Sequence, residues 1–201
     1  MDPSISSETL QLRLSAENFR EQLLAQPKKD PRIVSVQIEI SNEHFLLIPQ
    51  SYDSVTYRLG FLEKALGEHA LVGKEIHVQP IEQEGANLVF LVPSDWKDLI
   101  SAHFPFAKIV YTHLLAKCLL KKEQQLTLFV FGNLAFASLY QSQKLQLANV
   151  FPFESPIELA FFLQSIRDAF SLNWNLYPPL LVEGSEEISD ANLYQIPYVK
   201  S

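Results

Sequence analysis

The sequence has few of the residues on which many protein classes depend. Its one cysteine, Cys118, cannot form a disulfide within the chain, and a cysteine-rich zinc site would lack its ligands. No window reaches the ~18 consecutive apolar residues that a membrane helix needs, because Gly132 and Asn133 interrupt the longest apolar stretch, 126–139. The first residues also lack the basic and apolar regions of a signal peptide. We therefore expect a cytoplasmic protein without membrane insertion.

Basic charge is also scarce. The chain of 201 residues has 16 Lys and Arg against 23 Asp and Glu, which gives a formal net charge of −7. A nucleic-acid-binding protein needs a basic surface against the phosphates, and anionic membrane surfaces likewise attract basic segments. The charge therefore argues against nucleic acid as a partner. With 47% hydrophobic and 19% charged residues, the composition is that of an ordinary globular protein.

The first half of the sequence mixes strand and helix patterns. Alternating or β-branched apolar residues predict strands at 10–14, 33–40, 45–48, 76–78, 88–92 and 108–111. Apolar residues at helical spacing predict helices at 55–66, 94–103 and 114–122. The segment 15–26 fits two interpretations, either a helix that Ser15 caps or a second strand after a turn at 15–18.

The second half has clearer signals. Apolar patterns between short turns predict strands at 126–131, 134–140, 144–151 and 180–182. Ser155-Pro156-Ile157-Glu158 has a capping box with proline in the first helical position, the strongest helix start in the chain. Polar residues at 121–125 separate the two halves. We therefore predict an α/β fold of mixed sheets in two subdomains, 1–123 and 124–201.

Several segments, in their order along the chain, carry a resemblance to a known family. They are Leu12-Arg13-Leu14-Ser15, Phe45-Leu46-Leu47-Ile48-Pro49, Phe104-Pro105-Phe106-Ala107 followed by His113, Lys144–Phe151 leading to the helix at Ser155, and Leu181-Val182-Glu183-Gly184. These segments resemble an uncharacterised Bacteroidetes domain of unknown function whose fold belongs with the actin-like ATPases. The resemblance implies two actin-like, ribonuclease-H-like subdomains and no assigned activity. Because members of that family tend to be longer, we expect the C-terminal subdomain to be trimmed.

An actin-like ATPase would hold its nucleotide with two phosphate loops. Such loops need glycine for the close approach of backbone amides and an Asp for the metal-bound water. The corresponding turn in the first half, 15–18, has neither. In the second half Gly132 and Asn133 could contact a phosphate, but Phe131 stands where the acid is needed, and Gly184 takes the place of the purine-side turn. Binding of ATP with Mg would therefore depend on Gly132, Asn133 and Gly184. Ordinary turns are a simpler explanation for these three residues.

Other catalytic and metal sites lack their residues. A ribonuclease-H-type nuclease needs clustered carboxylates for two metals, and no Asp lies within or just past a predicted strand. No two histidines are three or four positions apart, so no helical metal pair exists. His103 and His113 flank the turn at Phe104-Pro105 and could meet in space, but a core position explains His113 better. Cys118 lies on an apolar helical stripe and is also expected in the core. We predict no catalytic residue and no metal site.

Phenylalanine is abundant, with 14 residues. Phe161 precedes Phe162, and Phe151 and Phe153 flank a proline, so simple periodicity cannot turn all four toward one interior. Either one or two of them form an exposed apolar patch for a partner, or their helix is buried on both sides. We predict a non-catalytic scaffold or protein-binding module, with an unidentified protein partner or self-association. The alternative is a nucleotide-binding protein or ATPase with a degenerate phosphate site.

Overall fold

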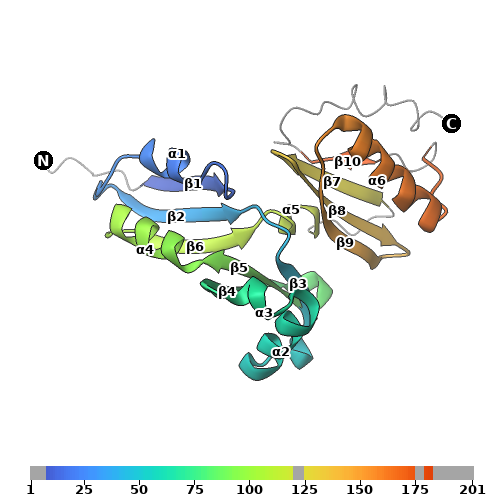
Figure 1. Ribbon diagram of the computed structural model, residues 1–201, viewed down its shortest axis with the longest axis horizontal. Coiled ribbons are helices and arrows are strands. Elements are labelled where there is room, and N and C mark those ends of the chain that lie inside the picture. Colours follow the sequence, from blue (N-terminus) through green and yellow to red (C-terminus); the bar gives the residue numbers. More distant parts are fainter. Residues whose placement is uncertain (1–7, 120–124, 175–178, 183–201) are drawn as a thin grey trace, which may run out of the picture. The chain divides into compact units, whose positions relative to one another are not determined.

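The computed structural model of the protein describes residues 8–119, 125–174 and 179–182. The chain divides into two compact units, Met1–His113 and Leu114–Ser201, and Figure 1 shows the elements of each. The boundary predicted between 123 and 124 lies outside the described residues. Both units combine sheets with helices, so the predicted mixed α/β architecture is confirmed.

The first sheet of the N-terminal unit is parallel. Its order is β1-β2-β6, with β1 at Glu8–Leu14, β2 at Ile33–Ile40 and β6 at Lys108–His113. Alternate residues of β2 are buried on one face, including Val36 and Ile38 at 0% exposure. Each strand in chain order is added on the same side of the previous one. Right-handed connections after β1 and after β2 therefore lie on the same face of the sheet.

Two helices cover that face. Helix α1 (Phe19–Leu24) follows β1, and helix α4 (Ser94–His103) precedes β6. The rings of Phe19 and Trp96 stack with their centroids 4.3 Å apart, which joins the two helices directly. The segment 15–26 therefore contains a helix, and this decides between the two interpretations of its sequence.

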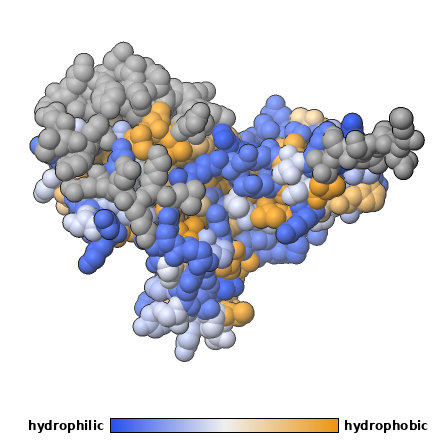
Figure 2. Space-filling view, turned by 180° about the vertical axis from the view of Figure 1, so that it is seen from behind, coloured by the Kyte–Doolittle hydropathy of each residue, from blue (hydrophilic) through white to orange (hydrophobic). Residues whose placement is uncertain are grey.

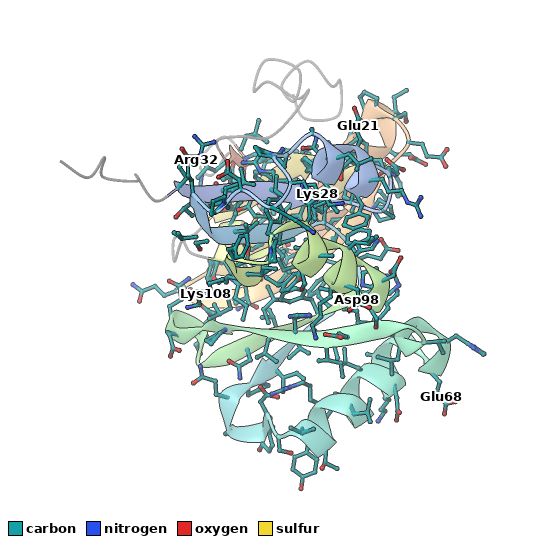
Figure 3. The ribbon with its side chains drawn as sticks, turned by 90° about the vertical axis from the view of Figure 1, so that its left-hand side faces the viewer. Glu21, Lys28, Arg32, Glu68, Asp98 and Lys108 are labelled. Atoms are coloured by element: carbon teal, nitrogen blue, oxygen red, sulfur yellow. The ribbon has the colours of Figure 1, made fainter. Side chains whose placement is uncertain are left out.

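The second sheet of the N-terminal unit is antiparallel, in the order β3-β5-β4. Its elements are β3 (Phe45–Pro49), a short 3₁₀ helix (Gln50–Tyr52), α2 (Val55–Leu66), α3 (Glu68–Leu71), β4 (Lys74–Ile81), a second 3₁₀ helix (Glu82–Glu84) and β5 (Ala86–Pro93). Figure 3 shows α2 and α3, which begins at the labelled Glu68, on one side of this sheet and α4 with Asp98 on the other. The strand predicted at 45–48 and the helix predicted at 55–66 are confirmed.

The C-terminal unit has one mixed sheet in the order β10-β7-β8-β9. Its strands are β7 (Gln125–Phe131), β8 (Leu134–Gln141), β9 (Lys144–Pro152) and β10 (Leu180–Leu181). The first three form an antiparallel meander, and β10 joins β7 in parallel. All four strands predicted in this half are confirmed.

Helices α5 (Ala116–Leu119) and α6 (Pro156–Ala169) lie on opposite faces of this sheet. The Ser138 hydroxyl donates to the Cys118 carbonyl of α5 at 2.8 Å, whereas Ala137, the preceding residue of β8, packs in the cluster that contains the α6 residue Leu163. Neighbouring residues of a strand point to opposite faces, which separates the two helices. The predicted start of α6 is confirmed, because its capping serine accepts a backbone hydrogen bond and proline follows it.

Candidate functional site

A groove in the N-terminal unit lies between the edge strand β3 and helix α2. It encloses about 380 Å³, which is within the range of ligand and peptide pockets. One lysine interrupts an otherwise apolar lining, formed by Leu46, Leu47, Ile48, Pro49, Phe61, Lys64 and Ala65. A concave apolar surface with one charged group can both bury an apolar side chain and orient a charged one.

A single buried side chain fixes the inner side of α2. Leu62 is fully buried and packs in a cluster with Ile48, Val89 and Leu91 of the sheet. The preceding residue, Phe61, is 43% exposed and lines the groove. Since neighbouring residues on a helix face different directions, anchoring Leu62 in the core presents Phe61 to the groove.

A polar network fixes the start of α2. The Ser54 hydroxyl accepts the N–H of Tyr57 at 3.3 Å and caps the helix. The Asp53 carboxylate, 2% exposed, accepts from Arg58 Nε at 2.7 Å and from the Asn87 amide of β5 at 2.5 Å. The Arg58 guanidinium, helped by that amide, holds the pKa of Asp53 below its usual value despite burial. Because Asn87 belongs to the sheet, the network holds the helix, and with it the groove wall, in place.

Helix α2 exposes several large apolar side chains. Val55, Tyr57, Leu59 and Phe61 are all exposed, as is Tyr52 just before the helix. In the coloured part of the face drawn in Figure 2, hydrophobic residues form separate patches among hydrophilic ones. Tyr57 and Phe61, four positions apart, share one side of the helix, and neighbouring exposed apolar residues mark interaction sites more often than single ones do.

The C-terminal unit also exposes one of its phenylalanines. Phe161 of α6 is 67% exposed, whereas the ring of Phe162 stacks on Phe151 with the centroids 5.2 Å apart. Of the two possibilities for this helix, an exposed apolar side chain is therefore the one observed. Phe153 packs against the sheet core, so the exposed position is Phe161 and not the whole group.

The residues predicted to contact a nucleotide lie in a turn or outside the described chain. Gly132 and Asn133 form the two-residue connection between β7 and β8, where Phe131 pairs with Leu134. Gly132 has a φ of +56°, a conformation that by itself favours glycine. Gly184 lies outside the described residues. Nothing in the structure tests the nucleotide role of these residues, which stays a prediction.

The structure does not bring His103 and His113 together. His113 ends β6, is 1% exposed and has its Nε2 atom 3.0 Å from the Asn42 carbonyl oxygen. Burial lowers the pKa of His113 to about 4, against the effect of that hydrogen bond. His103 ends α4 and lies 3.0 Å from the carbonyl oxygen of Gln26 instead. His113 is therefore a neutral core residue, as predicted.

Cys118 is likewise a core residue. Its thiol is fully buried and lies 3.3 Å from the Phe136 carbonyl oxygen, to which it donates. Burial raises the pKa of the thiol, so that the nucleophilic thiolate is disfavoured. In residues 8–119, 125–174 and 179–182, no three His, Cys, Asp or Glu side chains lie close enough to hold a metal ion. In the same ranges, no helix has the length and apolar character to cross a membrane.

The groove residues Phe61 and Lys64 are not among the residues predicted from the sequence. A signal for Phe61 does exist, because Tyr57 and Phe61 are four positions apart and so share one helix side. That side differs from the stripe of Leu62 and Leu66, which faces the sheet. No comparable pattern distinguishes Lys64 from other surface lysines.

A solved structure with a similar chain path defines the class of this fold. A Bacteroides thetaiotaomicron protein, described as having an actin-like ATPase fold and unknown function, is similar with a TM-score of 0.55 and 14% identity. The match covers 69% of this chain and 56% of that one, so the chain spans little more than half of that protein's length. At this identity the likeness shows the fold, which is actin-like.

The family follows from the sequence match. The family described as "Protein of unknown function (DUF3822)" matches residues 5–196, and the chain belongs to it. The resemblance predicted from the sequence segments is thereby confirmed. The cytoplasmic domain of EpsL, from the type II secretion system of Vibrio cholerae, is also similar, with a TM-score of 0.40 and 15% identity over 92% of this chain and 91% of that one. No functionally curated protein matches the sequence.

Proposed function

We propose that this protein is a non-catalytic protein-binding module and that it docks a partner polypeptide in the groove between β3 and α2. The observation that carries the proposal is the position of Phe61, an aromatic side chain that lines an apolar groove and is 43% exposed. Aromatic residues in such pockets dominate the binding energy of many protein interfaces.

The rigidity of the groove supports this function. Leu62 fixes α2 to the sheet from within, and the contacts of Asp53 with Arg58 and Asn87 fix its first turn. A binding surface that is already ordered loses little conformational entropy when a partner docks. These contacts therefore hold the helix that carries Phe61 and Lys64 in place beside the sheet.

Selection of short random peptides displayed on phage tests the proposal. We expect selection on the full chain to enrich peptides that bind the wild-type protein and bind Phe61→Glu at least about tenfold more weakly, since a carboxylate would replace an apolar anchor. Phe161→Glu is the matched control, because it introduces the same charge at an exposed phenylalanine in the other unit. Peptides that bind both variants equally, or no enrichment at all, would contradict the proposed docking site.

Thermal melting with nucleotides separates this function from a nucleotide-binding one. A ligand at 100 times its dissociation constant stabilises a protein by about 2.7 kcal/mol, or several degrees at this size. We expect no shift with millimolar Mg-ATP, Mg-ADP or Mg-GTP. A clear shift that Gly132→Val abolishes would instead support a degenerate ATPase site at Gly132 and Asn133.

A further inference from the structure

The groove has a feature that an apolar cleft alone would lack, which is the open hydrogen-bonding edge of β3. Among the strands of the described residues, β3 pairs with β5 on one side and is the last strand of its sheet on the other. An open strand edge presents backbone N–H and C=O groups to which another strand can pair. The groove therefore combines side-chain contacts with backbone hydrogen-bonding groups.

The hydrogen-bond pattern identifies the residue that faces outward. The Leu91 N–H donates to His44, and the Gln50 N–H donates to Gly85. These two bonds flank β3 and fix its even-numbered residues toward β5, because residues alternate between paired and unpaired positions along an antiparallel ladder. Leu47 then directs both its N–H and its C=O outward. Within the described part of the chain, no hydrogen bond from another element reaches these two groups.

The side chains next to this edge determine which faces of an added strand would be buried. Leu46 and Ile48 point toward α2 and belong to its core cluster, and Leu47 points to the opposite face by alternation. A residue paired with Leu47 would share the face of Leu47, so that its two neighbours would point into the groove beside Phe61. A strand that binds here would therefore carry two apolar residues separated by one other residue.

Lys64 adds a charge requirement. Lys64 belongs to the last turn of α2 and lines the same groove. In the described residues, no hydrogen bond or ion pair engages it. An unpaired cation beside an apolar groove favours a carboxylate on the partner at this point.

We propose that the partner is an extended acidic peptide segment that adds as a strand to β3. It exchanges two backbone hydrogen bonds with Leu47, buries two apolar side chains against Phe61 and α2, and pairs an Asp, a Glu or its C-terminal carboxylate with Lys64. This inference rests on the proposed function and specifies the partner that the groove accepts. Addition to a sheet edge is a recurring mode of peptide recognition.

A second copy of this chain is a poorer fit for the same edge. Two β3 strands could pair with each other, but Phe45–Pro49 contains no acidic residue. Such a pairing would therefore place no carboxylate of the added strand next to Lys64. Because pairing of two β3 strands lacks this carboxylate, an acidic segment of a different polypeptide is the better fit.

The test repeats the random-peptide selection on variants of the β3 edge and of Lys64. Leu47→Pro removes the outward N–H without removing a bond to β5, because proline is tolerated on strand edges that face solvent. Leu47→Ala is the matched control, since it keeps the N–H and shortens the side chain. We expect peptides selected on the wild type to lose about tenfold in affinity on Leu47→Pro and little on Leu47→Ala. Selection on Lys64→Glu should enrich Lys or Arg where the wild type enriches Asp or Glu.

Amide hydrogen exchange by NMR provides a readout that does not depend on the proline variant folding. On adding a selected peptide to the wild type, the Leu47 amide should become protected, while the amides of Leu46 and Ile48 are already protected by β5. Peptides that need Phe61 but leave the Leu47 amide unprotected would overturn strand addition and leave the docking function standing. If no peptide depends on Phe61, both proposals fail. Protection of Leu47 by dimerisation alone, seen by analytical ultracentrifugation, would replace the acidic segment with a second copy.

Discussion

Alanine substitutions at two glycines should change the stability of the protein in opposite directions. A Cβ at Gly60 or at Gly132 would meet no atom within 4 Å, so neither substitution creates a clash. Gly60 lies in the middle of α2, where glycine is less favourable than alanine by about 1 kcal/mol, so that Gly60→Ala should raise the free energy of unfolding by that amount. Gly132 has a φ of +56°, and the left-handed conformation costs a residue with a Cβ about 1–2 kcal/mol. Gly132→Ala should lower the free energy of unfolding accordingly.

Urea denaturation followed by tryptophan fluorescence can measure both effects separately. Trp96 lies in the N-terminal unit with Gly60, and Trp174 lies in the C-terminal unit with Gly132. Variants that keep one tryptophan therefore report on one unit each. Gly132→Asn is the control, because asparagine tolerates a positive φ better than alanine does, and it should cost less. An unchanged midpoint for Gly132→Ala, or a destabilised Gly60→Ala, would refute the argument from backbone conformation.

Three further predictions concern side chains elsewhere. Ser155→Ala removes the cap of α6 and should lower the free energy of unfolding by about 1 kcal/mol, as measured by urea denaturation. The buried Cys118, whose thiol pKa is raised, should react with a thiol reagent only after unfolding; rapid modification of the native protein would contradict its placement. His113 has a folded pKa of about 4, below its unfolded value of ~6.5, so the unfolded state binds more protons between these pH values. Stability should therefore fall by about 3 kcal/mol as the pH is lowered through this window, and His113→Gln should lack this pH dependence.

The C-terminal sheet could be predicted from sequence because its pairings are local. β7, β8 and β9 follow one another through two-residue turns, so that each strand finds its partner next to it in the chain. The capping box at Ser155 is similarly local, since the hydroxyl accepts from a residue three positions later. Short-range patterns therefore carry the information that places these elements.

Contacts between distant segments decide the parts that local patterns leave open. The segment 15–26 has residues that suit a helix or a strand, and the stacking of Phe19 on Trp96 of α4 joins it to a helix much later in the chain. The groove depends in the same way on the pairing of β3 with β5 and on the docking of α2 through Leu62. A sequence pattern can mark Phe61 as an unusual surface residue, but only the tertiary arrangement places it beside the free edge of β3.

The central claim is that a partner docks beside Phe61, and site-specific photo-crosslinking tests this claim most directly. A photo-reactive phenylalanine analogue would be placed at position 61 and, as the control, at position 161, in cells that produce the protein. The proposed function predicts a discrete covalent adduct with another polypeptide from position 61 that is absent from position 161. The acidic-segment inference adds that Lys64→Glu suppresses this adduct. No adduct from position 61, or the same adduct from both positions, would contradict the proposed function.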